Sequence, residues 1–137
     1  MITGLDALFL EVNNLEESLF FYRDQLGFEL ESHSPEAEPP IATVHAGALK
    51  INLVQQLETM LKRGRGVHFV LGVHDVDTLF ARVCAADQRV PPPRDEGWGG
   101  RFISVLDPDG YRMVFVEWNT TSEVSKDELS TRRKPVD

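Results

Sequence analysis

Hydrophobic positions alternate with polar ones at the start of the chain and then change to a helical spacing. Over residues 5–12 the large apolar side chains fall on every second position, which predicts a strand with one buried face. Beyond it they recur three or four residues apart, as on one face of a helix: Leu15, Leu19, Tyr22 and Leu26. Asn14 suits the N-cap of this helix, and Gly27 suits its C-terminal end.

Three further apolar segments complete the first half of the chain. They cover residues 28–34, 41–47 and 49–56, so the first half is predicted as β-α-β-β-β. The same order returns in the second half, where Asp75 suits a helix N-cap, with elements over residues 67–73, 76–87, 89–91, 101–107 and 111–118. The short segment 89–91, RVP, is the expected third element, and DPDG at 107–110 is the turn between the last two strands.

The two halves align in register. Val12, Asn14 and Leu15 match residues of similar type 61 positions later, and this offset makes His68 the counterpart of Ala7. At the end of each half, KINLV aligns with RMVFV at an offset of 62, which makes Val114 the counterpart of Asn52. The repeat therefore marks four equivalent strand positions: Ala7, Asn52, His68 and Val114.

These patterns divide the chain into one domain over residues 1–118 and a polar C-terminal tail over 119–137. Inside the domain we expect module one at 1–57, a polar linker at 58–66 and module two at 67–118. The predicted fold class is α+β, with two tandem β-α-β-β-β modules.

Composition and charge narrow the classes of function. The 137 residues are 42% hydrophobic and 26% charged, which is typical of a globular domain. A net charge of −8 argues against an unaided nucleic-acid binder, because affinity for phosphate depends on Lys and Arg, and it favours cationic small molecules. There is no basic leader region and no apolar run near the ~18 residues that span a bilayer, so we expect a cytoplasmic protein without a membrane partner.

The internal repeat, the helical segment NNLEESLFFYRDQLGFEL and the closing segment DPDGYRMVFVEW together carry a resemblance. Over residues 5–118 the chain resembles the vicinal oxygen chelate superfamily, which includes glyoxalase I, extradiol dioxygenases, fosfomycin-resistance enzymes and bleomycin-resistance proteins. The resemblance implies two modules whose curled mixed sheets form a cup-shaped cavity, commonly in a homodimer.

The resemblance also implies where a metal would bind. In the metal-dependent members, a divalent ion is held by side chains of the first and last strands of each module, which are the four positions of the repeat. Ala7 and Val114 cannot ligate a metal, and Asn52 offers only a weak neutral oxygen, so His68 lacks partners and we expect no cofactor. The alternative is one divalent metal ion at a displaced site made by His68 and Glu11.

The segment DEGWGGRF is similar to the WG-R segment of bleomycin-resistance proteins, in which aromatic side chains at the cavity rim stack on the drug. The resemblance therefore favours a metal-independent small-molecule binding protein of bleomycin-resistance type, connected with antibiotic resistance. It would sequester an aromatic, cationic compound in a homodimer cleft. The expected ligand-binding residues are Phe9, Glu11, Asn52, His68, Trp98, Arg101 and Val114.

Two enzyme hypotheses stay open at the level of sequence. One is a metal-dependent lyase, isomerase or dioxygenase of the glyoxalase superfamily, with ligands displaced to His68 and Glu11. The other is a metal-free enzyme in which one of these two side chains acts as general base. The sequence assigns no catalytic residue.

Overall fold

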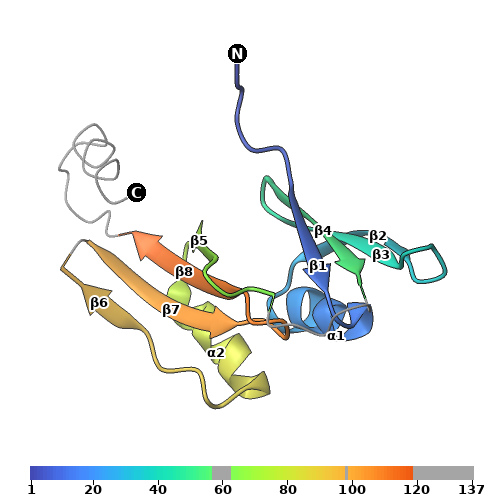
Figure 1. Cartoon of the computed structure of the whole chain (residues 1–137). Coiled ribbons are helices and arrows are strands. Elements are labelled where there is room, and N and C mark those ends of the chain that lie inside the picture. The colour runs from blue at the N-terminus through green and yellow to red at the C-terminus, as the bar shows by residue number, and fades with distance from the viewer. Residues whose placement is uncertain (57–62, 98, 119–137) are drawn as a thin grey trace.

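The computed structural model describes residues 1–56, 63–97 and 99–118. The predictions for Trp98, for linker residues 58–62 and for the tail lie outside the described residues. The first module contains β1 (Leu8–Val12), α1 (Leu15–Leu19), the π-helical segment η1 (Phe20–Gln25), β2 (Glu29–Ser34), β3 (Ile41–Ala46) and β4 (Leu49–Gln55). The second contains β5 (His68–Gly72), α2 (Val76–Ala86), β6 (Arg94–Glu96), β7 (Gly100–Leu106) and β8 (Arg112–Trp118) (Figure 1).

Each module forms a four-stranded mixed sheet with the same strand order. The orders are β1-β4-β3-β2 and β5-β8-β7-β6. β1 runs parallel to β4 and β5 parallel to β8, whereas the other pairs are antiparallel. This architecture confirms the predicted α+β fold of two tandem modules, and the two sheets remain open rather than closing into a barrel. Among the described residues, no helix has the length and apolar character that crossing a bilayer requires.

The strand register agrees with the internal repeat. In the first sheet Phe9 of β1 lies beside Asn52 of β4. In the second sheet Val70 of β5 lies beside Val114 of β8, and these residues stand 61 and 62 positions later in the sequence. The two halves therefore pair equivalent residues of their first and last strands.

The repeat extends to the contacts that begin each helix. The backbone N–H of Leu15 donates to Oε1 of Gln55 at 2.7 Å, and the N–H of Val76 donates to Oε1 of Glu117 at 2.9 Å. Side chains also cap both helices as predicted, because Asn14 accepts from the N–H of Glu17 and Asp75 from that of Thr78. The last strand of each module thus fixes the start of that module's helix.

A single hydrophobic core lies between the helices and the inner faces of the two sheets. Strand alternation places every second side chain on this side, and buried members come from both modules: Leu10, Val12, Val44, Leu53, Ile103, Met113 and Phe115. From the helices the core takes Leu15, Leu19, Val76 and Val83. Because one core serves both modules, the two sheets have a fixed relative position.

Two strand predictions differ from the structure. The first strand begins at Leu8, and residues 1–7 project from the body of the molecule (Figure 1). The strand predicted at 89–91 is wrong, because the third element of module two is β6, Arg94–Glu96. Pro91, Pro92 and Pro93 have no N–H for a sheet hydrogen bond, so pairing with β7 starts only after them.

The predicted first helix also changes type along its length. After α1, the N–H of Leu26 donates to the carbonyl of Phe21 at 2.9 Å, and the N–H of Phe28 donates to that of Tyr22 at 2.9 Å. The first bond joins residues five apart and the second joins residues six apart, whereas α-helical bonds join residues four apart, so the last turn is wider. Phe21 and Tyr22 are both buried there.

The DPDG turn joins the modules through two buried carboxylates. Asp107 Oδ2 accepts a hydrogen bond from the Tyr22 hydroxyl at 2.5 Å, and its Oδ1 accepts from the N–H groups of Asp109 and Tyr111. Asp109 accepts from the N–H of Asn13 at 2.8 Å. Burial raises the pKa of Asp107 to about 6 and also raises that of Asp109, because the interior disfavours their charged forms.

Candidate functional site

Each sheet has one face that does not pack on the helices, which we call its open face. On the first sheet this face contains Phe9 and Glu11 of β1 and Asn52 of β4, as alternation predicted. The Phe9 side chain is 63% exposed. Asn52 Oδ1 accepts from Thr43 Oγ1 at 2.7 Å, and Glu11 pairs with Arg63 at 3.1 Å. The amide and the carboxylate are therefore held in place by protein partners.

The first open face is continued by charged side chains of β2, β3 and β4. His45 makes a hydrogen bond to Glu31, and Lys50 lies 3.6 Å from the same carboxylate. The hydrogen bond from His45 and the charge of Lys50 lower the pKa of Glu31 from its ordinary value. The charges at this end of the face thus neutralise one another.

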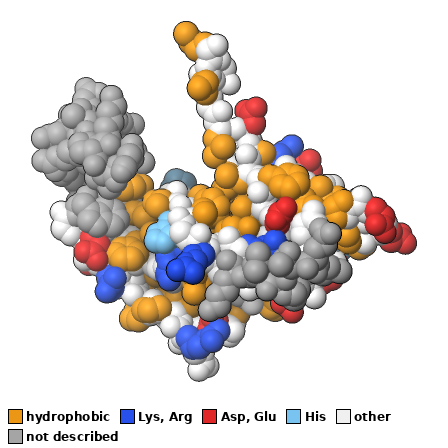
Figure 2. All heavy atoms as spheres, viewed as in Figure 1, with side chains coloured by type: hydrophobic (Ala, Val, Ile, Leu, Met, Phe, Trp, Pro, Cys, Tyr) orange, Lys and Arg blue, Asp and Glu red, His pale blue; other side chains and the backbone are white. Residues whose placement is uncertain are grey.

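The open face of the second sheet contains His68 and Val70 of β5 and Val114 of β8. Val70 is 59% exposed, and His68 is exposed as well. The guanidinium of Arg94 on β6 lies 5.3 Å from the ring centre of Phe102 on β7. Figure 2 shows hydrophobic side chains above both sheets, and basic side chains next to a histidine above the second sheet.

Arg101 lies on the opposite face of the second sheet. It donates to Asp77 in the first turn of α2 through two nitrogens, at 2.8 and 3.1 Å, and to Asp95 of β6 at 3.3 Å. The structure therefore brings Phe9, Glu11 and Asn52 together, and His68 with Val114, but separates Arg101 from all of them.

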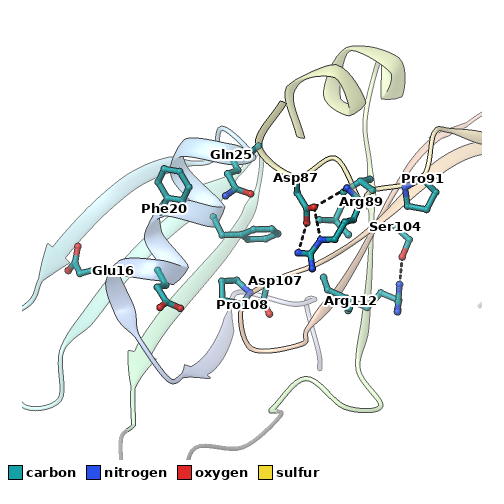
Figure 3. Close-up of a pocket in the computed structure, with 16 residues that line it drawn as sticks. Glu16, Phe20, Gln25, Asp87, Arg89, Pro91, Ser104, Asp107, Pro108 and Arg112 are labelled. Carbon is teal, nitrogen blue, oxygen red and sulfur yellow. Dashed lines mark hydrogen bonds and ion pairs between the residues drawn. The ribbon is translucent and has the colours of Figure 1, made fainter. Parts of the chain in front are cut away.

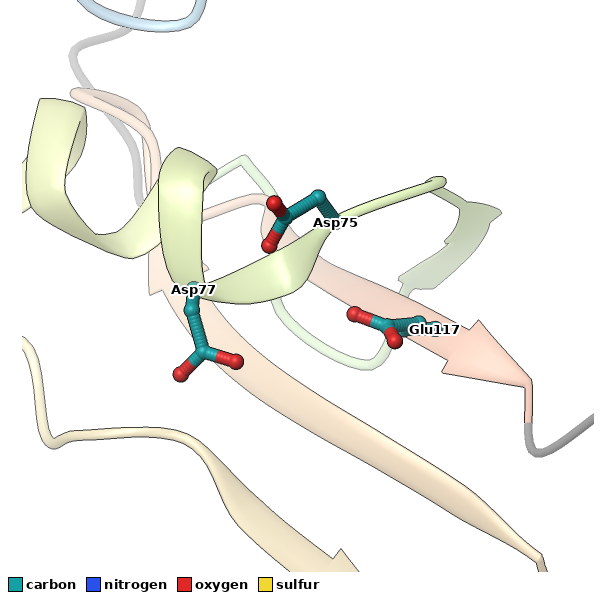
Figure 4. A group of neighbouring side chains, drawn as sticks. All are labelled: Asp75, Asp77 and Glu117. Atoms are coloured by element: carbon teal, nitrogen blue, oxygen red, sulfur yellow. The ribbon is translucent and has the colours of Figure 1, made fainter. Parts of the chain in front are cut away.

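An acidic cluster stands at the start of α2 and consists of Asp75, Asp77 and Glu117 (Figure 4). Each carboxylate already has a structural partner, since Asp75 caps Thr78, Asp77 binds Arg101 and Glu117 accepts from Val76. These hydrogen bonds lower the pKa of Asp75 and of Asp77. Capping and strand attachment account for the cluster without a bound cation.

A cavity of about 1010 Å³ opens between α1, η1, the end of α2 and the β7–β8 turn (Figure 3). Its lining includes Phe20 and Leu106, which are 54% and 53% exposed, together with Ser104 and Arg112. None of these residues is among the expected ligand-binding residues. Phe20 offered one sequence signal, because it is an apolar residue outside the helical stripe that forms the core.

Comparison with known proteins identifies the family. The model of the glyoxalase/bleomycin resistance protein/dioxygenase superfamily matches residues 4–115. The chain belongs to this superfamily. Among curated proteins, no relative matches the chain in sequence.

Solved structures with the superfamily fold include proteins with different described roles. A glyoxylase/bleomycin resistance protein/dioxygenase domain from Frankia sp. EAN1pec has a TM-score of 0.73 at 18% identity, over 87% of this chain and 100% of that one. TnmS3, an antibiotic binding protein from Streptomyces sp. CB03234, has a TM-score of 0.66 at 23% identity, over 86% and 98% of the chains. A mutant of the fosfomycin resistance protein FosX from Listeria monocytogenes, complexed with Mn(II) and 1S,2S-dihydroxypropylphosphonic acid, has a TM-score of 0.74 at 20% identity, over 88% and 95%.

The superfamily's metal positions do not fit a metal in this chain. Val114 stands beside Val70 in the sheet, and Asn52 stands beside Phe9, so a hydrocarbon side chain neighbours each position. Val114 and Ala7 offer no donor atom, which leaves His68 as the one good ligand of the four, whereas sites for Zn, Mn or Fe need about three. Glu11, the alternative partner of His68, lies on β1 of the other sheet and is paired with Arg63.

Proposed function

We propose that this chain binds a small amphipathic aromatic molecule on its open faces and does so without a metal ion. One observation carries the proposal. Phe9 and Val70 occupy equivalent positions next to two of the superfamily's metal positions, and both are exposed, by 63% and 59%. Apolar side chains exposed at corresponding points of both sheets favour a ligand whose rings cover them.

Polar side chains beside these apolar positions would orient the ligand. Asn52 keeps its amide N–H donors available, because its Oδ1 is the atom that accepts from Thr43. His68 projects from the same face as Val70, two residues away along β5. Val114 of β8, beside Val70, adds apolar surface to the same face. A mainly apolar surface with a few fixed polar groups is the usual composition of a small-molecule site.

The proposal includes a homodimer in which a second copy completes the cup. β1 and β5 are edge strands in their sheets, and the open-face side chains of Phe9 and Val70 on these strands are largely exposed. Sedimentation equilibrium tests this part, with an expected mass of twice the 15.5 kDa chain. A monomer at the concentrations used for binding would contradict it.

Metal independence is tested on protein purified without chelator or affinity tag. Elemental analysis should find less than stoichiometric metal, and titration with Zn, Mn, Fe and Ni should give no site of micromolar affinity. One metal per chain that disappears in His68→Ala would contradict the proposal and favour a metal-dependent enzyme.

Binding is tested with N-phenyl-1-naphthylamine, an uncharged aromatic dye that fluoresces in apolar surroundings. Phe9→Ala and Val70→Ala should each weaken dye binding, Phe9→Ala by about tenfold, because the lost aromatic contact area is large. Leu30→Ala is the control, since Leu30 is 39% exposed but stands beside the buried Val44, on the helix side of the first sheet. Equal losses in all three variants, or no dye binding by the unmodified chain, would contradict the site.

A further inference from the structure

The two faces of the second sheet differ in their balance of charge. The acidic side chains on the helix side are Asp75, Asp77, Asp95 and Glu117, and Arg101 is the basic side chain that pairs with two of them. On the open face, the charged side chains of the described strands are Arg112, His68 when protonated, and the pair of Arg94 with Glu96 at 4.0 Å. This face therefore differs in sign from the whole chain, whose net charge is −8.

Arg112 is the basic side chain of this face that belongs to β8. It stands beside His68 in the parallel pair of β5 and β8, so both side chains project from the open face. Its Nη1 donates to Ser104 Oγ at 2.5 Å. In the part of the chain that the structure describes, no carboxylate lies within ion-pair distance of its guanidinium, although five N–H donors need acceptors.

The cavity described above begins at Arg112 and Ser104 (Figure 3). Its acidic lining does not compete strongly for Arg112. Asp87 is bound to Arg89, and Asp107 is occupied by the Tyr22 hydroxyl and two backbone N–H groups. Glu16 is bound to His33.

The remaining acidic side chain of the cavity, Glu17, is exposed to solvent in the first turn of α1. Apolar surface in the same cavity comes from Phe20, Leu106 and Val90. A negatively charged group could thus approach Arg112 while the apolar part of the same molecule contacts Leu106.

We propose that the ligand carries an anionic group, and that Arg112, with His68 and Ser104 beside it, is the subsite that receives it. This inference rests on the proposed function, because it assigns the charge of the molecule that the open faces bind. The ligand class is an aromatic or apolar organic anion, such as a carboxylate or sulfonate, whose oxygens accept from the guanidinium. The sequence analysis expected a cationic compound because the whole chain is acidic. The anion subsite is inferred instead from the basic side chains close to Arg112.

Two dyes that differ by one group test the charge. 8-Anilinonaphthalene-1-sulfonate carries a sulfonate on the ring system of the uncharged N-phenyl-1-naphthylamine. The unmodified chain should bind the sulfonate dye about tenfold more tightly, since a hydrogen-bonded ion pair adds to the same ring contacts. Arg112→Gln should remove most of this advantage and leave binding of the uncharged dye within about twofold.

Controls separate the anion subsite from other effects. Arg89→Gln is the matched variant, because Arg89 lines the same cavity but is paired with Asp87, and it should change neither affinity. His68→Gln should weaken the sulfonate dye alone. Binding of the uncharged dye to Arg112→Gln shows that the open face of that variant is folded.

The outcomes distinguish the two proposals. If both dyes bind the unmodified chain equally, or Arg112→Gln weakens both to the same extent, the anion subsite is wrong and the proposed function stands. If neither dye binds the unmodified chain, the proposed function is wrong, and the anion subsite is then wrong as well.

Discussion

The hydroxyl of Tyr22 donates a hydrogen bond of 2.5 Å to the carboxylate of Asp107, 85 positions later in the chain. Both side chains are buried, and the bond connects η1 of the first module to the turn before β8 of the second. The Tyr111 hydroxyl crosses between the modules as well, donating to the backbone carbonyl of Glu11 at 3.0 Å. These polar contacts around one turn add to the shared hydrophobic core in fixing the relative position of the two open faces.

Tyr22→Phe should lower the free energy of unfolding by about 2 kcal/mol. The substitution keeps the ring in the core but leaves a buried carboxylate oxygen without its donor. Urea unfolding at neutral pH measures the change. Tyr111→Phe is a useful comparison. It removes the hydrogen bond to the Glu11 carbonyl, which is only partly buried, so the free energy of unfolding should fall by less. Equal stability of Tyr22→Phe and the unmodified chain would contradict the importance of this contact.

The free energy of unfolding should fall as the pH rises from about 4 to about 6. Burial raises the pKa of Asp107 from its ordinary 3.8 to about 6, so the folded chain holds this proton to a higher pH than the unfolded chain does. The stabilisation by protonated Asp107 is fully present below the pKa of this group in the unfolded chain. It is lost as the pH rises through the pKa in the folded chain, and the free energy of unfolding then falls by at most about 3 kcal/mol. Urea unfolding across this range measures the slope.

Asp107→Asn is the control for this pH dependence. Asparagine cannot ionise, so the decline between pH 4 and pH 6 should become much smaller. A residual slope of the same sign is expected from Asp109, whose pKa burial also raises. Exposed carboxylates such as Asp87 have lowered pKa values and act in the opposite direction, at lower pH. An unchanged slope in Asp107→Asn would assign the effect to another group.

Local sequence signals predicted the parts of the fold that depend on neighbouring residues. Asn14 and Asp75 cap helices as expected, and Gly27 has the positive φ that a helix end requires. The repeat also predicted which residues share an open face, because strand alternation is a local property. Prolines 91–93 displaced a predicted strand, and the π-helical turn at Phe21 departs from the 3.6-residue period on which the helix prediction rests.

The parts of the site that depend on packing between distant elements could not be predicted in this way. Arg101 was expected in the site from its place after the WG pair, but its register partner is Glu117, so it faces the helices. Alternation along the last strand places Arg112 on the same face as Val114, but its lack of an acidic partner depends on where distant carboxylates lie. The cavity beside it depends on how η1 packs near the β7–β8 turn.

Gly64→Ala should destabilise the chain by about 2 kcal/mol or more. A Cβ at this position would lie 2.2 Å from the backbone nitrogen of Tyr111 and 2.3 Å from the carbonyl carbon of Gly110, and neither atom can move without shifting the DPDG turn. Gly97→Ala is the matched control, because its Cβ would meet no atom within 4 Å and its stability should change by less than about 0.5 kcal/mol. Thermal unfolding of the two variants side by side decides the point.

Arg101→Gln should reduce stability modestly and leave ligand binding unchanged. The residue links α2 to β6 through Asp77 and Asp95, but these side chains are exposed enough for solvent to screen the ion pairs, so the expected loss is small. Because Arg101 lies on the helix side of the sheet, affinity for N-phenyl-1-naphthylamine should stay the same. Arg94→Gln provides the contrast, since Arg94 lies over Phe102 on the open face and its loss should alter dye binding. If Arg101→Gln has normal stability but binds the dye more weakly, Arg101 belongs to the binding site, as the sequence analysis predicted.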